Sequence, residues 1–207
     1  TDSSQDAEPA FESAFTTLSA VSGPEQTVTL GALYESCRRM KDPDKYKFQI
    51  ELTTRGAAIK TVTMSEFDDR DPDNPQPFVL LEPITSDSIV YSLASRGFRV
   101  AELQHDAFPS HSFPLHRLNW TLVSHDQNSA RFEALLGEVS VEEGRQVLDD
   151  PQIRLLKTYR IQPGSYDLAC EMTVENLTGL DIQTRLEMQG TGAMTKEDVR
   201  MDGRKVF

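Results

Sequence analysis

The clearest pattern in this sequence is an alternation of apolar and polar residues in its last third. Between positions 166 and 175 every even position carries an apolar, tyrosine or cysteine side chain. A period of two is what a strand with one buried face produces. We therefore expect the even positions to be buried and their odd-numbered neighbours to be exposed. The even positions are Tyr166, Leu168, Cys170, Met172 and Val174.

Two further strands flank this one, at 153–161 and 182–188. Pro163 and Gly164 end the first, because proline has no N–H to donate and glycine tolerates positive φ. Three consecutive strands with short connections predict an antiparallel meander with one wet face. The apolar face of the two flanking strands would comprise Ile153, Leu155, Tyr159, Ile161, Ile182, Leu186 and Met188.

The first half of the chain contains shorter strands. Residues 46–54 alternate, and Arg55 and Gly56 interrupt the pattern before a β-branched run starts at Ala58. Because Gly56 must turn the chain directly between two strands, we expect it in a backbone conformation that other residues rarely adopt. The alternating apolar residues are Tyr46, Phe48, Ile50 and Leu52. The other predicted strands are 27–30, 58–64, 78–82, 89–93, 119–124 and 130–136.

The remaining segments are predicted as loops. Residues 68–77 and 139–150 are acidic, and the pattern weakens between 95 and 114. Roughly ten strands without a convincing long helix predict an all-β chain, a β-sandwich of two antiparallel sheets. We expect a flexible tether over 1–25, because its composition cannot offset the entropy of ordering. The sandwich would then span 26–190, and a tail 191–207.

Composition limits the partners. The chain has 207 residues and a formal net charge of −12, which argues against nucleic-acid phosphates and anionic lipid headgroups as ligands. No window approaches 18 consecutive apolar residues, the length that predicts a transmembrane helix. The chain begins at Thr1 without methionine or a signal-peptide core. We therefore expect it to be a soluble piece of a longer protein.

Few residues are candidates for chemistry. Asp69, Asp71 and Asp73 alternate as at the start of a calcium loop, but Asn74 replaces the turn glycine and Leu80 the bidentate glutamate. A solvated acidic loop is the better interpretation. Four histidines lack the spacing of a helical zinc site, and we favour ordinary loop histidines over a metal or catalytic role. They are His105, His111, His116 and His125.

The two cysteines, Cys37 and Cys170, leave two possibilities open. Cys170 falls on the inward face of the most regular strand, which favours a buried apolar thiol. A disulfide between the two would be possible in an oxidising compartment. No nucleophile, phosphate-loop or dinucleotide motif occurs. We expect no catalytic, cofactor-binding or metal-binding residues.

Three stretches, in this order, resemble the large periplasmic domain of the YidC-type membrane protein insertases of Gram-negative bacteria. The first is 50–58, a strand ending in the corner Thr-Thr-Arg-Gly-Ala. The second is 76–82, Gln-Pro-Phe-Val-Leu-Leu-Glu. The third runs from Lys157 to Leu168, Lys-Thr-Tyr-Arg-Ile-Gln-Pro-Gly-Ser-Tyr-Asp-Leu, and continues through Val174-Glu-Asn.

The resemblance implies a β-supersandwich similar to galactose mutarotase. It also implies a non-catalytic periplasmic domain of a bacterial inner-membrane protein, which assists insertion and folding of other membrane proteins. Its partners would be Sec translocon components and nascent membrane proteins, contacted through the full-length protein. We expect a monomer without cofactors, and a tail at 191–207 that leads toward the membrane part.

Two function classes stay in competition. A mutarotase-type sugar-binding or aldose-epimerase sandwich would need a histidine acid, from His105, His111 or His116, facing a carboxylate base across a cleft. A periplasmic interaction or chaperone-like module would need an apolar groove or a free edge strand that holds an extended peptide. The resemblance favours the interaction module.

Overall fold

The protein is built from antiparallel strands. The computed structural model describes residues 18–34, 42–69, 71, 73–85, 88–101, 112–192 and 194. Over these residues the only helical element longer than an isolated position is a three-residue 3-10 turn, η2 (Leu115–Arg117). None of the described segments forms a helix long and apolar enough to cross a membrane. The prediction of an all-β chain is therefore confirmed.

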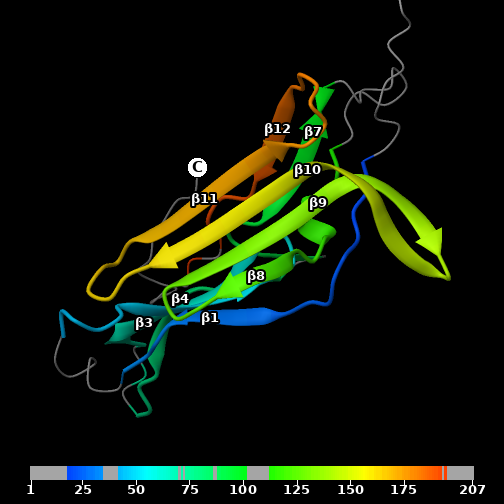
Figure 1. Cartoon of the computed structure of the whole chain (residues 1–207). Coiled ribbons are helices and arrows are strands. Elements are labelled where there is room, and N and C mark those ends of the chain that lie inside the picture. The colour runs from blue at the N-terminus through cyan, green and yellow to red at the C-terminus, as the bar shows by residue number, and fades with distance from the viewer. Residues whose placement is uncertain are drawn as a thin grey trace, which may run out of the picture.

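The first sheet has four strands that follow one another in sequence order (Figure 1). The prediction that the four apolar side chains of 46–54 share a buried face is confirmed. The alternation is incomplete, because Lys47 and Thr53 at the intervening positions are buried as well. In the sheet, Ile50 lies opposite Val62 of the neighbouring strand. The strands are β1 (Thr27–Gly31), β2 (Phe48–Thr53), β3 (Ala58–Asp68) and β4 (Pro77–Leu81).

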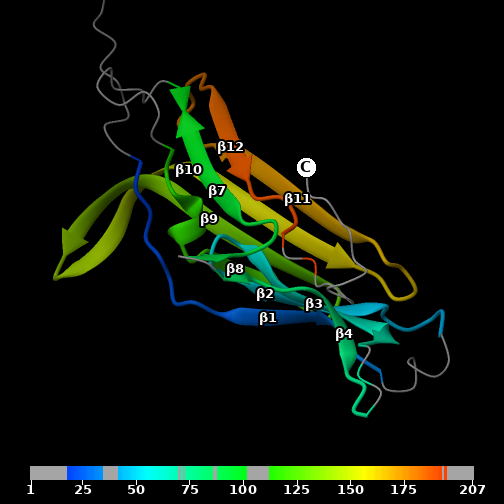
Figure 2. The ribbon, with the colours of Figure 1, turned by 180° about the vertical axis from the view of Figure 1, so that it is seen from behind.

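The second sheet has the order β11-β10-β9-β8 and lies across the first (Figures 1 and 2). Its strands are β8 (Thr121–His125), β9 (Ser129–Glu142), β10 (Arg145–Ile161) and β11 (Leu168–Asn176). The predicted acidic loop over 139–150 is wrong. These residues form the far part of a long β9–β10 hairpin that closes at Glu143 and Gly144. Both faces of this ribbon are largely wet, so its sequence carries no alternation.

Two small sheets complete the fold, β5 (Ile84–Thr85) with β6 (Ile89–Val90), and β7 (Ser95–Val100) with β12 (Thr184–Met188). The predicted three-strand meander is thus right for β10 and β11 and wrong for β12, which pairs with β7. Strand β7 was not predicted, because Arg96, Gly97 and Arg99 interrupt its pattern although Phe98 and Val100 are buried. Tertiary pairing outweighed the weak local signal.

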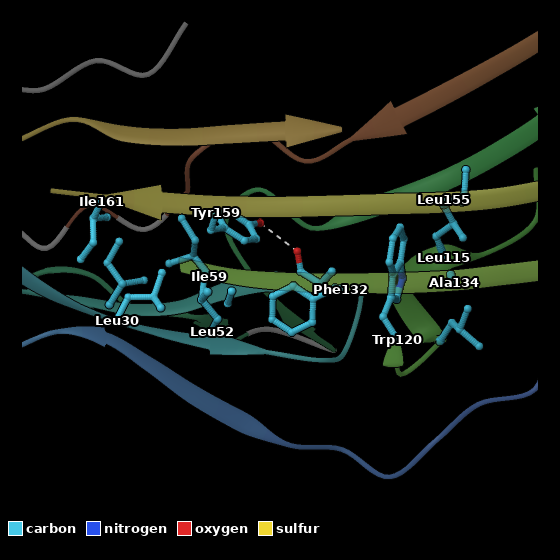
Figure 3. Packing of buried hydrophobic residues seen from close by; sticks show 14 of the residues in the cluster. Leu30, Leu52, Ile59, Leu115, Trp120, Phe132, Ala134, Leu155, Tyr159 and Ile161 are labelled. Atoms are coloured by element: carbon cyan, nitrogen blue, oxygen red, sulfur yellow. Dashed lines mark hydrogen bonds between the residues drawn. The ribbon is translucent and has the colours of Figure 1, made fainter. Parts of the chain in front are cut away.

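The two four-stranded sheets contribute to one hydrophobic core. Figure 3 shows Leu52 and Ile59 of the first sheet beneath Tyr159 of the second, with Phe132 beside them. The rings of Phe132 and Tyr159 meet edge to face with centroids 6.2 Å apart. Such face-to-face packing of two sheets is what the alternating faces of β2 and β10 require.

The strand at the outer edge of the second sheet is less covered than predicted. On β10, Ile153, Leu155 and Tyr159 are completely buried. On β11 the even positions do share the inward face, but Leu168 and Met172 are only half-buried. The prediction that all five even positions are buried is wrong for Tyr166, Cys170 and Val174, which are exposed. Alternation fixes which face points inward, not whether another element covers it.

The corner between β2 and β3 has a left-handed backbone, as predicted. Gly56 has φ +66° and Ala57 φ +45°. A Cβ on Gly56 would lie 3.2 Å from His116 Cα and 3.4 Å from Ser95 O. Hydrogen bonds from Gly56 N to Leu118 O (2.9 Å) and from Ser95 N to Gly56 O (2.9 Å) hold the corner between η2 and β7.

We expect the burial difference between β10 and β11 to appear in stability. Leu155→Ala should reduce the free energy of unfolding by about 2–5 kcal/mol, as for a buried leucine. Leu168→Ala, on the half-covered edge strand, should cost clearly less, about 1 kcal/mol. Urea unfolding of both variants measures this, and equal losses would contradict the core placement described above.

Gly56→Ala should destabilise the fold more than a glycine at the same φ in open space. Gly144, with φ +78° and no atom near its virtual Cβ, is the matched control. Both alanines would experience the left-handed penalty of about 1–2 kcal/mol, and only the alanine at 56 would also crowd His116. Unfolding midpoints in urea compare the two, and a Gly144→Ala loss as large as that of Gly56→Ala would remove the crowding argument.

Candidate interaction surfaces

Two left-handed corners of the chain are tied to β10 by buried hydrogen bonds. Ala57 and Leu93 both have positive φ, at 45° and 53°, which is unfavourable for residues with a side chain. Tyr159 Oη donates to Ala57 O at 2.8 Å, the contact dashed in Figure 3. Lys157 Nζ donates to Leu93 O, and to Ser95 Oγ at 3.2 Å. Both corners therefore offer a carbonyl to a buried side chain of the central strand.

Lys157 is a cation inside the core. Its side chain is 0% exposed, and among the described residues no carboxylate forms an ion pair with it. Burial lowers the pKa of the Lys157 ammonium from 10.5 to about 8, with a smaller opposing effect from Cys170. The ammonium group offsets part of the cost of its burial by donating to two polar atoms of the 93–95 segment, Leu93 O and Ser95 Oγ.

A second buried cluster joins the β10–β11 turn to β3. Lys47 Nζ lies 2.5 Å from Glu66 Oε1 and donates to Asp42 O at 2.9 Å. Tyr166 Oη donates to Glu66 Oε2. Burial, together with Glu66, raises the pKa of the Tyr166 phenol to about 12. Tyr166 thus joins the cluster through its hydroxyl group, while half of the residue remains exposed to solvent.

The outer face of the second sheet is a ladder of ion pairs. Arg154 on β10 contacts Glu133 on β9 at 2.6 Å and Glu175 on β11 at 3.4 Å. Arg160 contacts Glu171 on β11 at 2.8 Å. Most of these side chains are substantially exposed, so each pair contributes at most about 1 kcal/mol. This is the wet face that the odd positions of β11 predicted.

The inward face and the free edge of β11 differ from that ladder. Within the described residues, β11 pairs with β10 and with no other strand. Its inward face presents the half-buried Leu168 and Met172 and the exposed Val174. The outer edge of β1, by comparison, is partly occupied, since Gly31 N donates to Gln127 O at 2.8 Å and His125 Nε2 lies 2.8 Å from Thr29 O.

Of the histidines and cysteines singled out for chemistry, those that the structure describes are held by separate contacts. His116 Nδ1 lies 2.9 Å from Arg96 O and His125 Nε2 contacts β1, so main-chain carbonyls of two different sheets position the two rings. His105, His111 and Cys37 lie outside the described residues. Cys170 is a free, exposed thiol whose pKa is raised by partial burial of its sulfur.

The acidic loop after β3 uses its carboxylates locally. Asp69 Oδ1 accepts the main-chain N–H of Gln76 at 3.0 Å, and Asp71 Oδ1 accepts that of Asp73 at 3.0 Å. These are turn-stabilising contacts of a solvated loop. Over the described part of the chain, no three His, Cys, Asp or Glu side chains are grouped closely enough to hold a metal ion.

In the residues that the structure describes, these features define an all-β domain that offers an open strand edge and a half-covered face. The chain belongs to the YidC periplasmic domain family, whose model matches residues 44–202. It is thus a non-catalytic periplasmic domain of an inner-membrane protein, part of a membrane protein insertase. No curated protein and no solved structure matches the chain.

The depressed pKa of Lys157 has a consequence for stability. Between pH 8 and 10.5 the unfolded chain binds this proton and the folded chain does not, so the free energy of unfolding should rise with pH. Lys157→Met removes the group and keeps the volume. The free energy of unfolding of the wild type, minus that of the variant, should increase by up to about 3 kcal/mol between pH 8 and pH 10.5.

Denaturant unfolding at a series of pH values measures this difference. The tyrosines with raised pKa values oppose the trend above pH 10, but both proteins contain them and their effect cancels. They are Tyr46, Tyr91, Tyr159 and Tyr166. A difference that does not change with pH would mean that Lys157 titrates as a solvated lysine.

Proposed function

We propose that this domain assists insertion and folding of inner-membrane proteins by binding extended protein segments along β11. The partners in this proposal are Sec translocon components and nascent membrane proteins, met through the full-length insertase. The observation that supports it is the β11 edge strand, which among the described residues has a partner on one side only. An unpaired edge can accept a further strand by main-chain hydrogen bonds.

The inward face of β11 would add apolar contact to this pairing. Leu168, Met172 and Val174 occupy even positions of a nine-residue strand, so an added strand could place its own alternate side chains beside them. Main-chain bonds would supply affinity for any extended segment, and the apolar row would favour hydrophobic ones. Nascent membrane proteins are rich in such segments.

Anchoring of the full-length protein in the membrane would strengthen binding beyond the affinity of the β11 edge itself. Affinity of the isolated domain should be weak, because tethering raises the effective concentration of the partner. The net charge of −12 would repel anionic headgroups. The tether expected over 1–25 is too long at its C-terminal end, because Ser19 bridges to Gly137 and Asn119 N donates to Ser22 Oγ at 3.0 Å. The domain would therefore stand off the bilayer on the part of the chain before Leu18, with residues 191–207 leading toward the membrane part.

For the architecture we propose a β-supersandwich similar to galactose mutarotase. Two four-stranded sheets that share one core support it. A sugar-binding function of the mutarotase type has less support. Of the three histidines considered for an acid, the described one, His116, is held by a main-chain carbonyl.

Photo-crosslinking in membranes that carry the full-length insertase tests the proposed edge. A photo-reactive residue at Val174 should crosslink to Sec components or to a nascent chain. The matched control is Val123 on the opposite edge strand β8, which is more exposed, at 49% against 37%, and should give fewer products. Val174→Lys should reduce crosslinks from a probe at Met172.

Deletion of residues 27–190 is the stronger arm of the same experiment. It should abolish the contacts that depend on this domain. If every Sec-component contact survives the deletion, the partner-binding proposal is wrong and the domain is a spacer. If Val123 crosslinks as strongly as Val174, binding occurs without preference for the β11 edge.

A further inference from the structure

A small pocket with several cationic side chains lies on this acidic protein, away from β11. Its volume is about 120 Å³, and Arg55, Arg96, Arg117, His116, Tyr91 and Gln189 contribute to its wall. Arg55 comes from the β2–β3 corner, Arg96 from β7 and Arg117 from η2. Three arginines lining one pocket are unexpected in a chain with a net charge of −12.

No ion pair with a described residue engages Arg55, Arg96 or Arg117. No described lining residue is acidic. Arg96 Nη1 donates to Gln189 Oε1 at 2.9 Å, which is a neutral acceptor. Burial raises the pKa of the Tyr91 phenol, Glu25 adds to this increase, and Arg55 opposes it. Glu25 does not line the pocket.

The backbone that holds the arginines is fixed before any ligand arrives. The main chain of Arg55 bridges to Asn119, and Gly56 is hydrogen-bonded to both Leu118 and Ser95. Gln189 N donates to Ala94 O at 2.8 Å, and His116 Nδ1 lies 2.9 Å from Arg96 O. The corner, η2, β7 and the end of β12 are thus joined to one another around the pocket, which reduces the entropy lost on binding.

Lys157 supports the same segment from inside the core. Its ammonium group binds the carbonyl of Leu93 and the hydroxyl of Ser95, next to Arg96. The strained 93–95 segment is therefore held between a buried cation below and the pocket above. A backbone over-determined in this way keeps its side chains in a defined arrangement.

We propose that this pocket binds a single carboxylate group of a partner protein, from an Asp or Glu side chain flanked by apolar residues. Guanidinium groups match carboxylate oxygens through paired N–H donors. The volume fits one such group and excludes a large ligand. Ile89, 50% exposed on the wall, would contact the neighbouring apolar residue. This inference rests on the proposed function, because it assigns a second contact to the same kind of partner.

A lipid headgroup is the less favoured occupant. A bilayer presents many anionic groups together, and the net charge of −12 would be repelled by that surface. One carboxylate on a peptide brings a single negative charge to a locally positive pocket. The acidic surroundings would also disfavour partners that carry several negative charges, so the pocket should select isolated acids.

NMR titration of the isotope-labelled chain tests the proposal. The probe is an N-acetylated, C-amidated Leu-Glu-Leu tripeptide, with Leu-Gln-Leu as its neutral match. We expect saturable shifts around Arg55, Arg96 and Arg117 with the acidic peptide only, weakened by added salt. The double variant Arg55→Gln/Arg117→Gln should lose affinity at least about tenfold. Arg131→Gln, which removes one exposed charge from β9, should leave the affinity unchanged.

Each alternative result has a defined meaning. Equal binding of the two peptides, or an unaffected double variant, would overturn the carboxylate site. Arginine-dependent binding to vesicles of phosphatidylcholine and phosphatidylglycerol in equal parts, without peptide binding, would assign the pocket to lipid instead. Arg117 is exposed and without a described partner, so a folding defect in Arg117→Gln alone is not expected and the single variant provides a second measurement.

The two proposals fail separately. If the purified chain does not bind the acidic peptide while Val174 still crosslinks in membranes, the pocket inference is wrong and the edge proposal stands. If the peptide binds through the arginines but no crosslink depends on residues 27–190, the pocket exists and the proposed function is wrong.

Discussion

The structure depends on the hydrogen bonds that β10 sends across the core to two left-handed corners. Tyr159 binds the carbonyl of Ala57 and Lys157 that of Leu93. Each corner has a backbone conformation that is unfavourable for a residue with a side chain, and each presents a carbonyl to a buried side chain of β10. The central strand of one sheet thereby stabilises the turns that connect the elements packed against it. Apolar contacts hold the sheets together, and these polar contacts fix how they are arranged.

The same corners organise the surface. Gly56 packs against His116, and its main chain bonds to η2 and β7, so the corner carries Arg55 to the place where Arg96 and Arg117 also lie. The buried Lys157 ammonium next to the 93–95 segment and the three arginines that line the pocket are therefore parts of one arrangement. In a protein with many carboxylates, such a local excess of positive charge is a feature of tertiary structure, because the three arginines are far apart in sequence.

The second sheet shows how one element can be both structural and available for binding. β10 is buried along its inward face, while its neighbour β11 is covered on one edge and only partly on that face. The ion pairs of the outer face keep that side wet and charged. The family to which the chain belongs implies membrane protein substrates. An edge strand with a half-covered apolar row is the feature that our proposal assigns to contacts with such proteins.

The sequence by itself determined the strands with strong alternation, the left-handed Gly56 and the family. Period two over 46–54 and 153–161 leaves a strand with one buried face as the only structure that buries those residues together. Tertiary structure decided what local pattern does not encode. Val174 is exposed because no described element covers it, and β12 pairs with β7 rather than with β11. Residues 139–150 form a hairpin although both of its faces are largely exposed to solvent. The burial of Lys157 and the meeting of Arg55, Arg96 and Arg117 likewise depend on contacts between segments distant in sequence, which no local periodicity records.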